Sequence, residues 1–472
     1  MGTSQAPLLR PLGGTGLQCH PLGFGCYRVM EGNATHEAAL REYLHRGGNL
    51  IDTSANYGDG RSELMVGNIL KEYPEGQAIV VTKGGYIQGQ NLTLARKRTF
   101  PEVVQYDEDL WHSIHPEFLE TQLRRSAQRL RRNTLDVYLL HNPEYYLEDA
   151  ARRGTIGEKQ HREFYRRIRE AFGFLEEKVR AGEICWYGVS SNNFVKPSSD
   201  PTATSIERCW QAAESVSQRH HFRVVQLPLN LYESGGALQA SHGGRTALEF
   251  CREHGIGVLV NRPLNAFAFG GMVRLADFLK PGQTPPDRQS LRAALSGLRA
   301  LEEALHQRFE IPVPCGTPGG IAEYLEHLVP QVSSVAHWEQ VLYPYLIQPL
   351  ERWATECQQL YGQHAEWRQW WTQFAEMFPA VLEKIRWHIA ASRQSLSDEI
   401  RARLRQAGYP ADGETLSQMA LRLLTQLEGV SSVLVGMRRP EYVADAFGAA
   451  GGSGLDGLGI LSRFGALPSR NS

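Results

Sequence analysis

Short apolar segments rich in β-branched residues alternate along this chain with longer segments of helical periodicity. Turn residues bound each apolar segment, as is typical of strands. Most of these segments are almost continuously apolar, which is expected where both faces of a sheet are covered. The pattern predicts eight strands, at Leu22–Val29, Asn49–Ser54, Ala78–Lys83, Asp136–His141, Ile184–Ser190, Val224–Asn230, Ile256–Pro263 and Ser432–Met437.

Helices with recognisable starts lie between several of these strands. One starts near Thr35, and another runs from His115 to Leu130 with Pro116 in its first turn, where proline is well tolerated. Eight strand–helix units predict an α/β fold, a closed (β/α)₈ TIM barrel. The alternative is an open, doubly wound sheet, which the lack of a Gly-x-Gly-x-x-Gly pattern after the first strand disfavours. Before the first strand, Leu9–His20 has the pattern of a hairpin that could plug the bottom of the barrel.

The interval between the seventh and eighth strands is much longer than a barrel needs. Such a barrel takes about 250 residues, and the chain has 472. The surplus is concentrated at about 273–412, which is too long for a loop and becomes strongly helical. We therefore predict strands one to seven with the hairpin at 1–272, a large helical insertion at 273–412, and the last barrel unit with a tail at 413–472. A smaller insertion, Ile87–Ser113, follows the third strand.

The large insertion contains large apolar side chains at helical spacing. The simplest interpretation is a buried amphipathic stripe that packs on other helices. The alternative is an aromatic cap that shapes a substrate pocket at the barrel mouth. The stripe consists of Trp367, Trp370, Trp371, Phe374, Met377, Phe378 and Val381.

Composition excludes several classes of partner. The formal net charge of -1 indicates neither a nucleic-acid surface nor an anionic membrane as partner. No stretch approaches the roughly 18 apolar residues of a membrane span, and no secretory signal is visible. The seven scattered cysteines, without Cys-x-x-Cys, predict free thiols in a reducing, cytoplasmic compartment and no metal site.

Three strand ends carry ionisable side chains. Asp52, Lys83 and His141 close the second, third and fourth strands, and Tyr57 follows on a glycine-rich loop. The carboxyl ends of barrel strands converge on one face, so the four side chains are expected to meet there. An ammonium favours a phenolate, so Lys83, held by Asp52, is expected to lower the pKa of Tyr57. A neutral His141 can donate a hydrogen bond to a substrate oxygen.

Such a set can protonate a carbonyl oxygen while hydride arrives at the carbon. Each residue alone has a plainer interpretation. Tyr57 and Lys83 could face solvent, Asp52 could cap a helix, and His141 could be a structural histidine. Four such coincidences on one rim are much less frequent than any one of them, so we favour an active site.

These segments resemble the aldo-keto reductases. The resemblance covers about 8–86, 117–265 and 413–450, and implies a (β/α)₈ barrel with an N-terminal hairpin. It also implies interconversion of carbonyls and alcohols with NADP(H), less often NAD(H). Tyr57 would be the general acid and base, Lys83 and Asp52 would tune its pKa, and His141 would orient the carbonyl. The matching motifs are Asp52-Thr53-Ser54-x-x-Tyr57-Gly58-x-x-x-Ser62-Glu63, Val81-Thr82-Lys83 and Leu139-Leu140-His141-Asn142-Pro143.

The resemblance further implies contacts to the cofactor. A Ser-Asn pair after the fifth strand would meet the nicotinamide carboxamide, and within Ser190-Ser191-Asn192-Asn193 we prefer Ser191 and Asn192. Gln226 on the sixth strand is the matching glutamine, an amide ligand with paired donors and acceptors.

Basic residues follow the last two strands. Asn261 or Arg262 replaces the stacking aromatic residue that the family often has after the seventh strand, and Arg262 is a candidate for the pyrophosphate. After the eighth strand, Gly436 and Arg438 are candidate cofactor contacts, with Arg438 or Arg439 as a fork for the adenosine 2′-phosphate. The plainer interpretation of the two arginines is a solvated basic pair.

The sequence thus predicts an NADP(H)-dependent oxidoreductase, with NAD(H) as the second option. It would interconvert an aldehyde, ketone or sugar with its alcohol, as a monomer or weak homo-oligomer. The alternative is a nucleotide-binding, redox-sensing regulatory subunit that contacts a partner through the helical insertion. An exposed Trp-rich helix would favour that alternative, and a buried one the enzyme.

Overall fold

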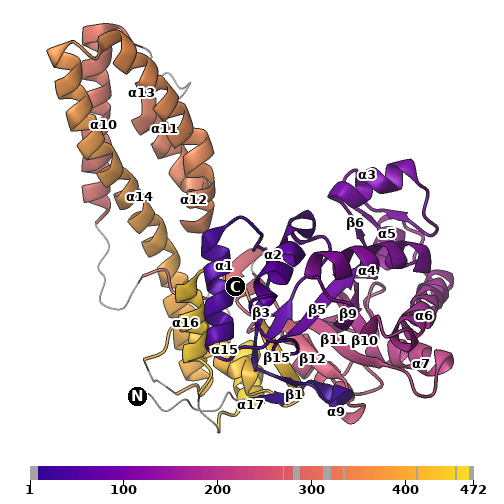
Figure 1. Ribbon diagram of the computed structural model, residues 1–472. Coiled ribbons are helices and arrows are strands. Elements are labelled where there is room, and N and C mark those ends of the chain that lie inside the picture. Colours follow the sequence, from indigo (N-terminus) through magenta and orange to yellow (C-terminus); the bar gives the residue numbers. More distant parts are fainter. Residues whose placement is uncertain are drawn as a thin grey trace. The chain divides into compact units, whose positions relative to one another are not determined.

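The structure, a computed structural model, describes residues 9–268, 270–279, 287–311, 320–332, 335–410, 413–451 and 454–466. The chain divides into two compact units (Figure 1). The barrel unit comprises Met1–Leu275 and Arg403–Ser472, and the helical unit comprises Ala276–Ala402.

Eight parallel strands close into a barrel within the described residues, in the spatial order β10-β11-β12-β15-β3-β4-β5-β9. Each predicted strand corresponds to one of them, so the predicted (β/α)₈ barrel is confirmed. Their bounds are β3 Leu22–Gly25, β4 Leu50–Asp52, β5 Ile79–Gly84, β9 Leu135–His141, β10 Ile184–Ser190, β11 Phe222–Pro228, β12 Gly257–Asn261 and β15 Val430–Val435.

Helices cover the outside of the barrel (Figure 1). Their starts carry the expected caps: Asn33 Oδ1 accepts from the backbone N–H groups of Thr35 and His36, and Thr415 forms a capping box with Gln418. The helices of this layer are α1 Ala34–His45, α2 Arg61–Leu70, α4 Pro116–Leu130, α6 Glu158–Arg180, α7 Ile206–Val216, α9 Ala247–Glu253, α15 Leu416–Thr425, α16 Pro440–Gly448 and α17 Gly457–Ala466.

The N-terminal hairpin plugs the bottom of the barrel. Strands β1 (Arg10–Pro11) and β2 (Gln18–Cys19) pair antiparallel, and Leu12 is fully buried among inward-facing barrel side chains. Gly13 has a φ of 54°, and a Cβ there would lie 2.2 Å from the backbone nitrogen of Gly257. The plug therefore approaches the start of β12 at a distance that only glycine allows.

Short elements decorate the opposite, carboxyl-terminal rim. The smaller insertion forms a three-stranded sheet in the order β6-β8-β7, whose core includes Ile87 and Phe100. The rim elements are β6 Tyr86–Ile87, α3 Gly89–Lys97, β7 Val104–Gln105, β8 Trp111–His112, α5 Tyr145–Arg152, α8 Gly235–Leu238, β13 Asn265–Ala268 and β14 Gly271–Arg274.

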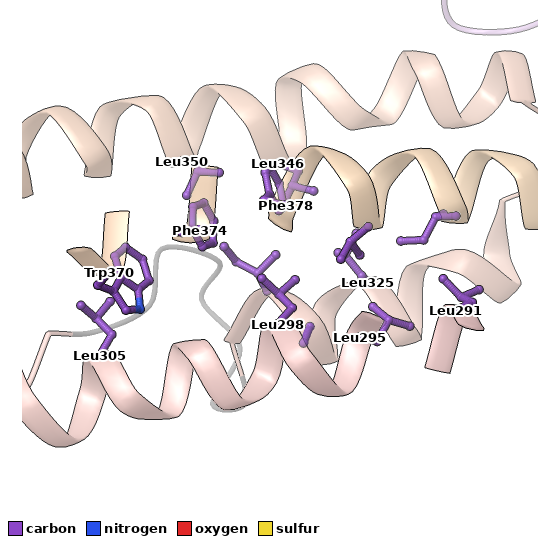
Figure 2. Close-up of a cluster of buried hydrophobic side chains, with 14 of the residues drawn as sticks. Leu291, Leu295, Leu298, Leu305, Leu325, Leu346, Leu350, Trp370, Phe374 and Phe378 are labelled. Atoms are coloured by element: carbon purple, nitrogen blue, oxygen red, sulfur yellow. The ribbon is translucent and has the colours of Figure 1, made fainter. Parts of the chain in front are cut away.

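The helical unit has a hydrophobic core of its own. Figure 2 shows leucines and aromatic rings pointing into the space between its helices. Trp367 is fully buried and Trp370 is 7% exposed, so the aromatic stripe packs inside this unit. The helices are α10 Arg288–Phe309, α11 Gly320–Leu328, α12 Val335–Leu342, α13 Gln348–Tyr361 and α14 Ala365–Gln406, with a π-helical turn at Tyr343–Ile347.

The helical unit is narrower than the predicted segment 273–412. Val273 and Arg274 pair with Ala266 and Asn265 in the β13–β14 hairpin, which belongs to the barrel unit. None of the helices in the described ranges is long and apolar enough to cross a bilayer. Six cysteines are free thiols, and Cys315 lies outside the described residues.

Candidate active site

Neighbouring strand ends bring the predicted catalytic residues together. Asp52 ends β4, Lys83 lies near the end of β5, and His141 ends β9. Tyr57 begins a 3₁₀ turn, Tyr57–Gly60, in the loop after β4. Because the strands are parallel, all four side chains share the carboxyl-terminal rim of the barrel.

Lys83 is the centre of this cluster. Its side chain is fully buried, and Nζ donates to Asp52 Oδ2 at 2.8 Å, to the Thr53 carbonyl oxygen at 2.9 Å and to Tyr57 Oη at 3.4 Å. Gln226 Nε2 donates to Asp52 Oδ1 at 2.7 Å. The carboxylate of Asp52 is thus held on both oxygens, and it orients the ammonium beside the phenol.

Burial governs the protonation of the cluster. It raises the pKa of Asp52 and lowers that of Lys83, while the attraction between the two charges opposes both shifts. Burial also raises the pKa of Tyr57 well above its ordinary value, and the charge of Asp52 raises it further. The expectation that the pKa of Tyr57 is lowered is therefore wrong for this structure, because burial and the charge of Asp52 outweigh the effect of the Lys83 ammonium. Tyr57 is a protonated phenol at neutral pH, ready to donate.

His141 is a neutral imidazole in this setting. Burial lowers its pKa well below the ordinary value, and the charges of Lys83 and His112 lower it further. Its Nδ1 lies 3.0 Å from Ser54 Oγ, and its ring meets that of Tyr57 edge-on at 5.9 Å.

Aromatic rings surround the cluster. Tyr27 meets the ring of Tyr57 edge-on at 5.3 Å, and Tyr86 meets the ring of His141 edge-on at 4.7 Å. Tyr145 packs edge-on against Tyr86 at 5.4 Å. Tyr86 begins β6, immediately before the smaller insertion, so the start of this rim sheet lies against the cluster.

The two serines at the end of β10 have different partners. Ser190 Oγ donates to Gln226 Oε1 at 3.0 Å, whereas Ser191 Oγ accepts from the Asn193 N–H at 3.1 Å and contacts Thr204. The structure therefore brings Ser190 to Gln226, not the predicted Ser191, because successive side chains of a strand point to opposite faces. The backbone N–H of the half-buried Asn192 donates to Glu144 Oε1 at 2.7 Å.

Two buried polar atoms lie where β12 ends, Asn261 Oδ1 and Arg262 Nε. Neither has a hydrogen-bond partner in the described structure. Arg262 has a φ of 53°, and its Nη2 donates to Glu233 Oε1 at 2.6 Å. Buried polar groups are normally satisfied, and a non-glycine residue at positive φ often marks a functional position. Both atoms fit a polar ligand that lies across the end of this strand.

Arginines gather near the ends of β3, β14 and β15. Arg274 is half-buried, and the charges of Arg438 and Arg28 lower its pKa in addition to burial. Across the described ranges none of these three arginines has an ion pair with a carboxylate. Uncompensated guanidinium groups at one place favour an anion such as phosphate. At Gly436, also predicted here, an added Cβ would meet nothing within 4 Å, so the surroundings are open.

The comparison with known families decides the class of the protein. The aldo/keto reductase family profile matches residues 21–312, which include seven of the eight barrel strands. The chain belongs to the aldo/keto reductase family. Within the described residues of this family member, no group of three or more His, Cys, Asp or Glu side chains could hold a metal ion.

Individual relatives match over part of their length. The NADH-specific methylglyoxal reductase of Escherichia coli is 32% identical over 139 residues, which cover 28% of this chain and 40% of the relative. An aldo-keto reductase of Bacillus subtilis, YhdN, is 24% identical over 225 residues, 46% of this chain and 53% of the relative. The chain thus spans about half the length of these curated relatives.

A solved structure shares the fold over nearly the whole chain. The glycerol dehydrogenase of Gluconobacter oxydans superposes with a TM-score of 0.51 and 18% identity, over 99% of both chains. At this identity the likeness concerns the fold.

Sequence reasoning missed several residues of this site in the aldo/keto reductase. Strand alternation places Ser190 on the face of Gln226, a signal that the choice of Ser191 does not use. The predicted insertion, 273–412, includes Arg274. Two apolar runs around Gly270-Gly271 nevertheless have the pattern of a β-hairpin that contains this residue. Arg28 carries no local signal, since the charges that it meets come from the distant Arg274.

Proposed function

We propose that this aldo/keto reductase interconverts a small carbonyl compound and its alcohol, using NADP(H) in preference to NAD(H). The observation that carries the proposal is the buried Lys83 ammonium, held by Asp52 and 3.4 Å from the Tyr57 hydroxyl. A phenol beside a fixed ammonium can give up its proton in the transition state and be stabilised as the phenolate.

The four residues divide the proton chemistry between them. Tyr57 donates its proton to the carbonyl oxygen during reduction and recovers it during oxidation. Lys83 stabilises the phenolate, Asp52 positions Lys83, and His141 orients the substrate oxygen beside the phenol. General acid catalysis of this kind contributes typically about 10²–10⁴-fold in rate.

The unsatisfied polar atoms near the strand ends suit a dinucleotide. When bound, a nicotinamide dinucleotide supplies or accepts the hydride. Gln226, Asn261 and Ser190 lie together through the Ser190–Gln226 and Asn261–Gln226 hydrogen bonds, and with Asn192 they would hold the carboxamide. Ser191, which caps the following turn, would support this loop from behind.

The basic residues suit the phosphates of the same ligand. Arg262, with its unpartnered Nε, would meet the pyrophosphate. Arg274, Arg28 and Arg438 form the larger positive group and would bind the 2′-phosphate that distinguishes NADP(H) from NAD(H), with Gly436 leaving room beside it. A charge-assisted hydrogen bond to phosphate is about twice as strong as a neutral one.

The regulatory alternative relied on an exposed Trp-rich helix. Trp367 is fully buried and Phe374 is 2% exposed within the helical unit. That feature therefore supports a folded helical core, and it no longer supports a docking surface for a partner protein.

The test is nicotinamide absorbance over time with purified protein, in both directions and with both cofactors. The panel should contain methylglyoxal, because one relative reduces it by name, and other aldehydes, ketones, aldoses and secondary alcohols. Tyr57→Phe is expected to abolish turnover and to leave nucleotide binding intact, since only the transferable proton is lost. Tyr146→Phe, whose ring packs under Arg167 instead, is the matched control and should keep its activity. Nucleotide binding without turnover on any compound would overturn the proposal.

A further inference from the structure

The backbone carbonyl of His141 lies where the neighbouring strand leaves the barrel. Strand β5 ends at Gly84, one residue short of the position opposite His141. The next residue, Gly85, has a φ of 148°, a conformation that glycine adopts freely. Tyr86 then pairs with His112 of β8 in the rim sheet. The chain after β5 therefore turns away before it reaches the carbonyl oxygen of His141.

His112 donates to this carbonyl oxygen in place of the strand. Its Nε2 lies 2.7 Å from the oxygen, and the residue is 2% exposed. A carbonyl oxygen can only accept, and 2.7 Å is too short for a ring carbon, so the atom at this position is a nitrogen that carries a proton. A Cβ on Gly85 would lie 2.7 Å from Nε2 and 2.9 Å from the His141 oxygen. Glycine at this position thus leaves the space that the hydrogen bond needs.

The same peptide group is also held at its nitrogen. The Asn142 N–H donates to the carbonyl oxygen of Ser190 at 2.7 Å, so the peptide that joins His141 to Asn142 is bonded at both ends. Asn142 has a φ of 50°, a left-handed conformation that is uncommon outside glycine. The two hydrogen bonds therefore fix the orientation of the peptide at the point where the chain turns out of β9.

We propose that His112 is a positioning residue, which fixes the peptide between His141 and Asn142 and thereby holds the ring of His141 beside Tyr57. The two rings meet edge-on at 5.9 Å. A rotation of this peptide would change the direction of the Cα–Cβ bond of His141 and would move the ring. Groups that act on a reacting atom need accurate placement, since a misplacement of about 1 Å can cost about 10²-fold in rate.

The rim sheet fixes His112 in its turn. The ring of His112 packs edge-on against Tyr86 at 5.7 Å and lies 5.5 Å from the ring of Tyr145. His112 is part of the smaller insertion, in β8, and Tyr145 begins α5. The smaller insertion thus acts on the catalytic cluster through a backbone group.

The direct test is hydrogen exchange of the Asn142 amide, followed by NMR without substrate or nucleotide. His112→Leu removes the donor, and His112→Asn keeps an amide that is too short to reach the carbonyl oxygen. Each variant should accelerate the exchange by about 5- to 150-fold, the effect of leaving a buried carbonyl oxygen without its donor. His112→Gln places an amide nitrogen at about the reach of the imidazole Nε2 and should restore slow exchange.

His254→Leu is the matched control. His254 is a half-buried histidine whose Nδ1 donates to the carbonyl oxygen of Phe250 at 2.8 Å. This bond has the same chemistry as that of His112, but it lies at the end of α9 in the outer layer of the barrel. Its loss should leave the exchange of the Asn142 amide unchanged.

Turnover is the second readout, and this arm of the test rests on the proposed function. His112→Leu should lower kcat by about 10- to 100-fold and leave the Kd for the nucleotide unchanged, and His112→Gln should restore kcat. General damage to the fold would weaken nucleotide binding as well, and glutamine would not repair it.

Unchanged exchange in both His112→Leu and His112→Asn would overturn the inference, and so would fast exchange in His112→Gln. A normal kcat in a variant whose Asn142 amide exchanges fast would overturn it too. The exchange measurement needs no substrate. The expected exchange rates in a protein without turnover on any compound would therefore count against the proposed function alone.

Discussion

Lys83 Nζ lies 2.7 Å from Asp52 Oδ1 in the barrel interior, where the two side chains are 0% and 6% exposed. Without its partner, either side chain would turn to solvent or lose its charge in the barrel interior. Together they keep an ammonium beside the phenol of Tyr57, where burial alone would leave only neutral groups. The pair is therefore stable only while both of its members are present.

Breaking this pair should destabilise the protein strongly. Lys83→Met leaves Asp52 buried without its partner, and removing one member of a buried pair costs about 3–5 kcal/mol. Urea unfolding of the barrel unit measures the loss. Asp52→Asn combined with Lys83→Met should recover much of it, because no buried charge remains. A double variant as unstable as the sum of the two single variants would show that the charges do not interact in this way.

Arg438→Ala should weaken NADPH binding more than NADH binding. The arginine joins Arg274 and Arg28 in a group without an ion-paired carboxylate among the described residues, and one hydrogen bond to a charged group is worth about 1.5–3 kcal/mol. Fluorescence titration should show the Kd for NADPH rising about 10- to 100-fold, with a smaller change for NADH. Arg274→Ala should act in the same direction, and Arg153→Ala, which pairs with Asp149, should change neither Kd. Equal losses for the two cofactors would place the phosphate site elsewhere.

Glu144 should make stability fall as pH rises. Burial raises its pKa from 4.5 to about 7, and its Oε2 has no partner in the described structure. A carboxyl whose pKa is higher in the folded state binds its proton more tightly there. Its stabilising contribution is complete below about pH 4.5 and is lost as pH rises through about 7, a change of about 3 kcal/mol.

Glu144→Gln removes this dependence, and urea unfolding at a series of pH values measures it. Between pH 5 and 8 the variant should lose about 2.5 kcal/mol less stability than wild-type protein. Glu158→Gln, at an exposed position of α6, is the control and should follow the wild-type curve. Parallel curves for wild-type protein and Glu144→Gln would mean that Glu144 titrates normally.

Trp367→Ala should destabilise the helical unit. The side chain is fully buried, and its Nε1 donates to Gln358 Oε1 at 2.8 Å. Truncating a buried tryptophan costs about 3–5 kcal/mol. Thermal unfolding followed by circular dichroism should show loss of helix at a lower temperature. Trp371→Ala, at a half-buried position of the same helix, should cost less, and equal effects would contradict the described core.

Local chemistry made the barrel predictable, together with the meeting of four polar side chains on one rim. A continuous run of apolar residues between turns predicts a strand at Ile184–Ser190, and these bounds match β10. Once eight parallel strands are inferred, chain direction alone sends Asp52, Lys83 and His141 to one rim. Helical periodicity is a property of contiguous residues, so the sequence could also predict helices such as α14 between the last two strands.

The sequence by itself thus determined the barrel architecture and the rim on which Asp52, Tyr57, Lys83 and His141 meet. Only the tertiary structure decided that Ser190 rather than Ser191 meets Gln226, that Arg28 and Arg274 join Arg438, and that Ser54 faces His141. Residues far apart in the chain make these contacts, and their register depends on how the strands pair. Packing in three dimensions also sets the pKa of Tyr57. It determines how deeply the phenol is buried and how close the charges of Asp52 and Lys83 lie to it.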